Sequence, residues 1–228
     1  MIVSRKKIDA AALQPTPWKN GGGVTREVAS QRATTEPANA VSAEPAGLAG
    51  FDAFDWRVSL AEVASSGPFS LFPGIDRVLV MTHGEQMVLK EGPDRTHALE
   101  RWQPFEFAGE VSITAHLPAG PTRDFNLMVR REYGRGQVQV HRAGPLTLGT
   151  GCAVLHCARG GFTLTVAGDD DGPATIELVE GDTLLLQVEG HAGISARPHV
   201  DDAALIDARV IATEGAPDMA PDVAVSRK

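Results

Sequence analysis

The stretch VLVMTHGEQMVL (Val78–Leu89) decides the fold, because its pattern returns in AVLHCARGGFTLTV (Ala153–Val166). Each copy reads as a strand, a glycine turn and a second strand, and Gly84 and Gly160 are 76 positions apart. The first copy continues through HALERWQPFEF and VSITAHLPAG, and the second through ATIELVEGDTLLL and AGISARP. Self-similarity at a fixed spacing indicates a repeated structural unit. The pattern alone is equally compatible with chance similarity between β hairpins.

Outside the repeat, short runs of alternating apolar residues fill the chain between 24 glycines and 15 prolines. Such runs are typical of the strands of a sandwich or barrel. A helical turn is expected only at Ile8–Leu13, because no longer window keeps a helical apolar period. The expected strands are Val24–Ser30, Trp56–Val63, Arg77–Thr82, Gln86–Lys90, Val111–His116, Asp124–Arg131, Gln137–Arg142, Ala153–Cys157, Phe162–Val166, Ala174–Val179, Thr183–Val188 and Ala204–Ile211.

The composition excludes several classes of protein. With 228 residues, 43% of them apolar, the chain can bury a core without a metal or a disulfide. A net charge of −8 argues against a nucleic-acid partner but allows a small anion in a locally basic pocket. The N-terminus has no signal-peptide pattern, and no stretch approaches the length of a membrane span. Two cysteines exclude a disulfide-rich secreted scaffold, so we expect a cytoplasmic protein without a membrane partner.

The densest motif is PWKNGGGVTRE, from Pro17 to Glu27. Consecutive glycines let a backbone approach a ligand closely, although they equally make a flexible turn. The motif lacks the Gly-Lys-Ser/Thr of a phosphate-binding loop. It supplies a stacking ring, a cation, an amide, exposed backbone N–H groups and a carboxylate. The candidate ligand-binding residues here are Trp18, Lys19, Asn20, Gly21, Gly22 and Glu27.

Strand alternation groups further polar candidates by face. Arg57 and Ser59 project together, opposite an apolar face, as a carboxylate-binding pair would. Asp124 and Asn126 share a face in the same way and can line a mixed pocket. Arg77 shares a face with apolar residues, so we expect an inward charge with a partner. Alternation leaves open which face points inward, and a solvent-facing polar side is the competing interpretation.

Three blocks of the sequence resemble those of a known family. The blocks PWKNGGGVTRE, FDWRVSLAEVASSGPFSLFPGIDRVL and RDFNLMVRR are similar, in this order, to those of the HutD/Ves family of bicupin proteins. The turn Glu180-Gly181-Asp182 before an apolar run also resembles the usual turn of a cupin barrel. The resemblance implies an all-β, cupin-like double β-barrel, a bicupin of the RmlC-like jelly-roll class. It further implies a small-molecule pocket and a regulatory or accessory link to bacterial histidine utilisation.

On this basis we expect three parts. Residues 1–142 form an N-terminal cupin-like barrel, residues 143–212 a C-terminal one, and residues 213–228 a flexible tail. The segment Ala33–Gly50 reads as a long surface loop beyond the family pattern, because Ala, Pro, Glu, Thr and Gly bury little apolar area.

Metal and thiol chemistry are weakly supported. The metal site of an enzymatic cupin requires two histidines separated by one residue, and no two of the seven histidines here have that spacing. We therefore expect no metal or other cofactor. His97 and His116 meeting across a barrel is the remaining metal alternative. Cys152 and Cys157 fall on opposite faces of one strand, which favours buried apolar roles over a disulfide or a nucleophile.

Three functions remain. The favoured one is a non-enzymatic regulator that binds a small carboxylate or amide metabolite of histidine breakdown. The second is a metal-independent isomerase or amidohydrolase with Glu27 or Asp124 as general base. The third is an interaction module, with Trp56 or Trp102 at an intermolecular face. A homodimer is compatible with all three.

Overall fold

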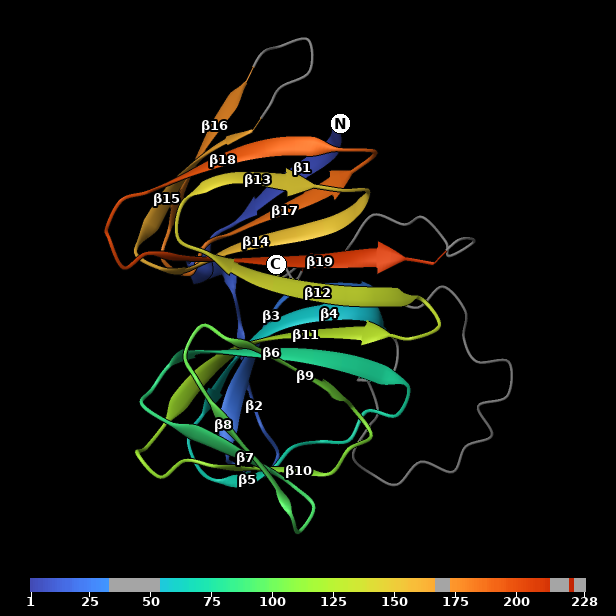
Figure 1. The fold of residues 1–228 in the computed structure, drawn as a ribbon, viewed down its shortest axis with the longest axis vertical. Coiled ribbons are helices and arrows are strands. Elements are labelled where there is room, and N and C mark those ends of the chain that lie inside the picture. Colours follow the sequence, from blue (N-terminus) through green and yellow to red (C-terminus); the bar gives the residue numbers. More distant parts are fainter. Residues whose placement is uncertain (33–53, 167–172, 214–221, 224–228) are drawn as a thin grey trace.

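The computed structural model describes residues 1–32, 54–166, 173–213 and 222–223 (Figure 1). Two β barrels are stacked one above the other, and each is built from two sheets (Figure 1). The predicted all-β fold with two barrels is therefore confirmed, and the short 3₁₀ turn Ala10–Ala12 lies inside the predicted Ile8–Leu13. None of the helical segments in the described ranges is long and apolar enough to cross a membrane.

The lower barrel in Figure 1 combines a large and a small sheet. The large sheet runs in the order β2 (Pro15–Pro17), β3 (Gly23–Arg32), β4 (Phe54–Val63), β11 (Thr122–Arg130), β6 (Ile75–His83) and β9 (Pro104–Ala108), with β20 (Asp222–Val223) also paired to β3. The small sheet runs β5 (Gly67–Pro68), β10 (Ile113–His116), β7 (Met87–Glu91) and β8 (Arg95–Leu99).

The upper barrel repeats this plan. Its large sheet runs β1 (Ile2–Ile8), β17 (Thr183–Val188), β14 (Gly151–Arg159), β19 (Ala204–Ala212) and β12 (Gly134–His141). Its small sheet runs β13 (Gly144–Leu148), β18 (Ala192–Pro198), β15 (Gly161–Val166) and β16 (Ala174–Val179).

The strand pairing confirms the internal repeat. Strands β4 to β11 pair with one another in the same order as β12 to β19. The two turn glycines identified in the sequence, Gly84 and Gly160, both have positive φ, at 102° and 73°. Glycine is the residue that adopts this conformation without steric cost.

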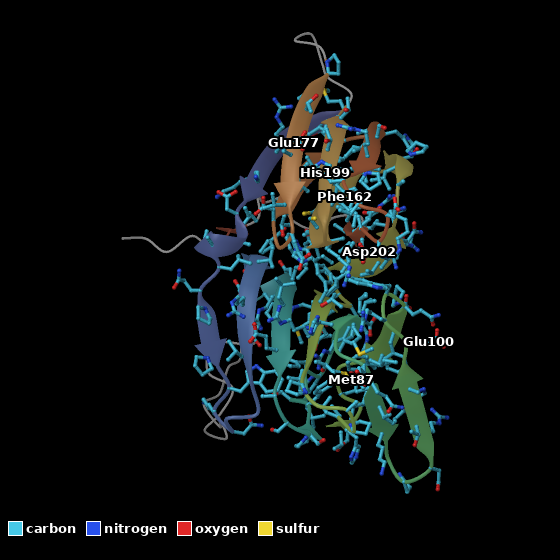
Figure 2. All side chains as sticks on the ribbon, turned by 90° about the vertical axis from the view of Figure 1, so that its left-hand side faces the viewer. Met87, Glu100, Phe162, Glu177, His199 and Asp202 are labelled. Carbon is cyan, nitrogen blue, oxygen red and sulfur yellow. The ribbon has the colours of Figure 1, made fainter. Side chains whose placement is uncertain are left out.

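Three apolar clusters account for most of the packing. One fills the upper barrel around Phe162 and another fills the lower barrel around Met87, both fully buried and visible inside their barrels in Figure 2. The largest lies between the two large sheets and contains Trp56 and Phe125. Trp56 is fully buried there, so its predicted place at an intermolecular face is wrong. This third cluster contains residues of both large sheets and so joins the two barrels.

Two strands differ from the predicted domain boundary. β1 pairs with β17 and β12 pairs with β19, so both ends of the segment 1–142 belong to the sheet of the upper barrel. The repeat explains β12, because it stands in the second copy where β4 stands in the first. β1 is an added edge strand whose partner is far away in sequence, so no local pattern could reveal it.

Two further predictions concern segments that lie wholly or largely outside the described residues. The predicted loop Ala33–Gly50 lies outside the described residues. In the predicted flexible tail, Asp222–Val223 form strand β20 against Ala29 and Ser30, which is a correction to that prediction. The remainder of the tail, apart from Thr213, lies outside the described residues.

Candidate functional site

The interior of the lower barrel carries a polar layer on its large sheet. Trp56, Val58, Phe125 and Leu127 pack into the core between the barrels. The alternate residues of the same strands therefore face into the lower barrel. The register places Glu27, Ser59 and Asn126 in one row across β3, β4 and β11, next to Arg57 and Arg77. Alternation predicted that Arg57 and Ser59 share a face, but it left open which face points inward.

Glu27 and Arg57 form the more accessible part of this layer. Arg57 Nε donates to Glu27 Oε2 at 2.8 Å, and Ser30 Oγ donates to Glu27 Oε1 at 2.8 Å. The side chain of Glu27 is 36% exposed and that of Arg57 12% exposed, so the pair connects the interior to solvent. A guanidinium in this setting can bind a second carboxylate.

Arg77 is the buried cation of the layer. Its Nε and Nη2 donate to Asn126 Oδ1 at 3.3 and 3.2 Å. Its guanidinium carbon lies 4.8 to 5.5 Å from the ring centres of Phe69, Phe72 and Phe107. Burial lowers the pKa of Arg77 to about 10, opposed by the charge of Asp124. The predicted partner of this inward arginine is thus an amide and three aromatic faces.

Asp124 is the buried acid. Burial raises its pKa to about 7, although the positive charge of Arg77 acts in the opposite direction. A carboxyl group with this pKa exchanges its proton near neutral pH, which is the property required of a general acid or base. Asp124 pairs in register with Ala61 on one side and Met81 on the other, so its neighbours on the sheet are apolar.

The glycine motif lies at one end of the same barrel. Lys19, Asn20 and Gly21 are exposed in the turn before β3, and Gly21 has a φ of 70°. Asn20 Oδ1 accepts the N–H of Gly22 at 2.9 Å, which closes the turn. Of the motif residues before β3, Trp18 is the one that reaches inward, and its Nε1 donates to Thr25 Oγ1 at 2.7 Å. The structure therefore does not bring this turn together with the polar layer.

Phe107 is the neighbour of the site that the sequence analysis missed. It pairs in register with Arg77, from a strand that was not separately predicted. The available signal was the alternation in Pro104–Ala108, where Phe105 and Phe107 share a face.

Two hollows lie along the boundary between the barrels. The first has a volume of about 250 Å³, and among the predicted site residues Asp124 alone lines it. The second has a volume of about 380 Å³ and is lined by residues of both barrels, including Trp102, Arg142 and Asp202. Neither includes Arg57, Ser59, Arg77 or Asn126.

Metal and thiol chemistry find little support in the described part of the chain. No group of three or more His, Cys, Asp or Glu side chains there is arranged to hold a metal ion. His97 lies beside Glu91 at 3.3 Å and packs against Phe105. Cys152 faces the core between the barrels and Cys157 the core of the upper barrel, which confirms their predicted opposite faces. Burial raises the pKa of each thiol to about 12.

Comparisons with known proteins cover most of the chain. The family model HutD matches residues 10–204. Protein Ves of Cronobacter sakazakii is 36% identical over 152 residues, which are 66% of this chain and 70% of that protein. Protein Ves of Citrobacter koseri is 34% identical over 152 residues, 66% of this chain and 67% of that one.

Solved structures share the fold. A conserved protein of unknown function from Pseudomonas aeruginosa PAO1 matches with a TM-score of 0.75 and 26% identity, over 92% of this chain and 100% of that one. HutD from Pseudomonas fluorescens SBW25 matches with a TM-score of 0.68 and 26% identity, over 91% and 100%. Oxalate decarboxylase of Bacillus subtilis matches with a TM-score of 0.57 and 8% identity, over 91% and 77%, which places the fold in the cupin class.

Proposed function

The chain belongs to the HutD family, and from that premise we propose that the interior of its lower barrel binds a small metabolite carrying a carboxylate and an amide or formyl group. Arg57 meets the carboxylate, while Asn126 and Ser59 contact the amide or formyl oxygen. Such compounds arise in histidine breakdown, and the family name refers to histidine utilisation. The protein acts as a regulatory or accessory component that senses this metabolite.

The observation that carries the proposal is the burial of Arg77, Asp124 and Asn126 in one barrel. Their exposed fractions are 8%, 3% and 6%. Moving a guanidinium and a carboxyl group out of water is costly, and well-packed apolar residues in their place would often give equal or greater stability. A polar layer inside a small barrel is therefore better explained by recognition of a polar ligand than by stability.

The glycine motif contributes less directly than its sequence suggests. Lys19 and Asn20 stand at the end of the barrel, and their exposure suits a role at its rim. Gly22 has no room for a side chain without contact to Asn20, since a Cβ there would lie 3.2 Å from Asn20 Oδ1. We assign this turn to the rim of the barrel, where it closes one end without contact to the bound metabolite.

The test is calorimetric titration of the full chain with histidine, urocanate, formiminoglutamate, formylglutamate and glutamate, with and without chelator. We expect saturable, chelator-insensitive binding of one compound. At about 100 times its Kd, that compound should also raise the free energy of unfolding by about 2.7 kcal/mol. Arg57→Ala should weaken that binding at least tenfold, whereas Arg135→Ala, an exposed arginine on β12, should not. Binding that survives both Arg57→Ala and Asn126→Leu would place the ligand elsewhere.

A second function is favoured by the pKa of Asp124 alone. A carboxyl group that titrates near 7 inside a barrel suits a metal-independent isomerase or amidohydrolase with Asp124 as the base. Chromatographic turnover assays on the bound compound separate the two functions. Turnover abolished in Asp124→Asn would support the enzyme, and binding without turnover in the wild-type chain would support the sensor.

A further inference from the structure

The hollow that Asp124 lines is built partly from equivalent positions of the two repeats. The end of β6 contributes Thr82 and His83, and the end of β14 contributes Ala158 and Arg159. These pairs keep the 76-residue offset of Gly84 and Gly160. The hollow, here called the inter-barrel cleft, has a volume of about 250 Å³, room for about eight water molecules.

Trp102 stands in this cleft at the position where the second repeat has a glycine. The N–H of Trp102 donates to the carbonyl of Met81 at 3.0 Å, as the N–H of Gly181 donates to that of Cys157 at 2.8 Å. The φ of Trp102 is 72° and that of Gly181 is 91°. Among the described residues, Trp102 is the one non-glycine with positive φ.

A tryptophan at this position, in place of glycine, strains the backbone and so lowers the stability of the fold. A bulky side chain in the left-handed region is a genuine outlier, worth about 1–3 kcal/mol of strain, and such strain gathers at functional sites. The side chain of Trp102 is held at the cleft, with the guanidinium carbon of Arg142 5.3 Å from its ring centre. Figure 2 shows the neighbouring Glu100 on the lower barrel and Asp202 on the upper one, at the boundary that this turn spans.

His156 brings to the same cleft a ring nitrogen without a hydrogen bond to any described side chain. His156 lies on β14 and is 3% exposed. In the first repeat the equivalent residue, 76 positions earlier, is Val80, which packs between the barrels. Its Nδ1 lies 2.9 Å from Thr183 Oγ1, and Nε2 has no protein partner among the described residues. Burial lowers the pKa of His156 to about 4, so the ring is neutral and Nε2 offers one hydrogen bond to an occupant.

One arginine in the walls of the cleft has no close carboxylate. Arg26 and Arg123 share the single carboxylate of Glu62, at 2.8 and 3.8 Å. The longer distance exceeds a hydrogen bond, and Arg123 makes no closer side-chain contact within the described part of the chain. On the opposite wall Arg159 is held by Asp202 at 2.6 Å. Asp124 on the same wall and Glu180 on the upper-barrel wall also line the cleft, so Arg123 stands out as the lining arginine without a carboxylate at hydrogen-bond distance.

We infer that the inter-barrel cleft is a second ligand site, which takes a planar single-ring carboxylic acid. It is distinct from the site proposed at Arg57, Ser59 and Asn126, although Asp124 of the polar layer also lines it. The ring stacks on the indole of Trp102, the carboxylate meets Arg123 and Arg26, and a ring or carboxyl atom bonds to His156 Nε2. Aromatic stacking and a charge-assisted hydrogen bond together select for planarity and for the anion. The inference does not rest on the function proposed for the lower barrel.

The test is calorimetric titration of the full chain with benzoate, nicotinate and urocanate. Cyclohexanecarboxylate and benzamide are the matched probes that lack planarity or charge. We expect saturable binding of at least one planar acid, at least tenfold weaker binding of both matched probes, and quenching of tryptophan fluorescence on binding.

Two variants each introduce the residue that the other repeat has at the equivalent position, so both are expected to fold. Trp102→Gly restores the residue of the second repeat, and His156→Val restores that of the first. Both should weaken the acid at least tenfold, and Trp102→Gly should leave the free energy of unfolding unchanged or higher because the backbone strain is relieved. The control Arg135→Gln should bind as the wild type does. Absence of saturable binding by all three acids, or binding unchanged in both variants, would overturn the inference.

Discussion

The Nζ of Lys7 lies 2.9 Å from the Oδ2 of Asp182, so an ion pair fastens the first strand of the chain to the turn before β17. Asp182 also accepts the N–H of Ala10 at 3.0 Å and that of Val179 at 3.3 Å. One buried carboxylate thus joins β1, the 3₁₀ turn and the hairpin of β16 and β17.

Replacing this carboxylate should destabilise the upper barrel. We expect Asp182→Asn to lower the free energy of unfolding by about 2–4 kcal/mol, because it leaves two backbone donors and Lys7 poorly matched. Urea unfolding at neutral pH measures the change, with the exposed Asp201→Asn as control. An equal effect of both substitutions would contradict the role of Asp182.

The same carboxylate predicts an acid-dependent loss of stability. Burial acts to raise the pKa of Asp182, but its bonds to Lys7, Ala10 and Val179 outweigh burial and hold the pKa below its usual 3.8. Its stabilising contribution is therefore complete above pH 3.8 and is lost as the pH falls through the lower folded-state pKa. In Asp182→Asn that part of the acid dependence should disappear from urea midpoints measured down to pH 2.5.

Asp124 should give the opposite dependence. Because burial raises its pKa from 3.8 to about 7, the folded protein binds the proton more tightly than the unfolded chain does between these values. The contribution of Asp124 to the free energy of unfolding should therefore be greatest below pH 4 and fall as the pH rises towards 7. Asp124→Asn should flatten this region of the profile and stabilise the protein at pH 8 by roughly 1–3 kcal/mol. Parallel profiles for the two proteins between pH 4 and 8 would refute the raised pKa.

The faces of the site strands were predictable because alternation depends only on neighbouring residues. Arg57 shares a face with Ser59, and Asp124 shares one with Asn126, as alternation predicted. Alternation left open which face points into the barrel, and the apolar residues at the alternate positions lie in the core between the barrels. The opposite faces of the two cysteines followed from the same rule.

Contacts between distant segments could not be predicted in this way. The pairing of Arg57 with Glu27 depends on the register of β3 against β4, which contains a bulge after Glu27. β1 was missed because IVSRKKI exposes five of its seven residues and so shows no alternating apolar face. The strained turn at Trp102 becomes visible only when the two repeats are aligned through the carbonyls of Met81 and Cys157.

The third glycine of the motif should tolerate no side chain. A Cβ on Gly23 would lie 2.4 Å from the carbonyl oxygen of Glu62 and 3.1 Å from the ring of Trp18. The backbone of β4 must then move, so Gly23→Ala should cost about 1–3 kcal/mol. Gly149→Ala is the matched control, because a Cβ there meets no atom within 4 Å. Thermal unfolding of the two variants makes the comparison, and equal midpoints would disprove the close approach.

The two thiols should be inert in the folded protein. Cys152 and Cys157 are 7% and 0% exposed, and burial raises each pKa to about 12, so little thiolate exists near neutral pH. We expect no reaction with a thiol-specific chromogenic disulfide at pH 8 on the time scale of mixing, and two equivalents of reaction in urea. Fast labelling of either cysteine in the native protein would contradict this.

The charge of Arg77 should not be replaceable by lysine. The guanidinium spans Asn126 with two N–H groups while three phenylalanine rings surround it. An ammonium group keeps the charge but loses the planar fork and the stacking. Arg77→Lys should therefore lower the free energy of unfolding by about 2–3 kcal/mol. The paired substitution Arg77→Met with Asp124→Leu removes both buried charges and should recover most of that loss, while binding of the metabolite disappears. Arg131→Lys is the control, because that arginine likewise makes more than one side-chain contact, to Asp76 and Glu110, but at the surface. If the paired variant were less stable than Arg77→Lys, the polar layer would be a stabilising network, and the argument from its cost to a ligand would fail.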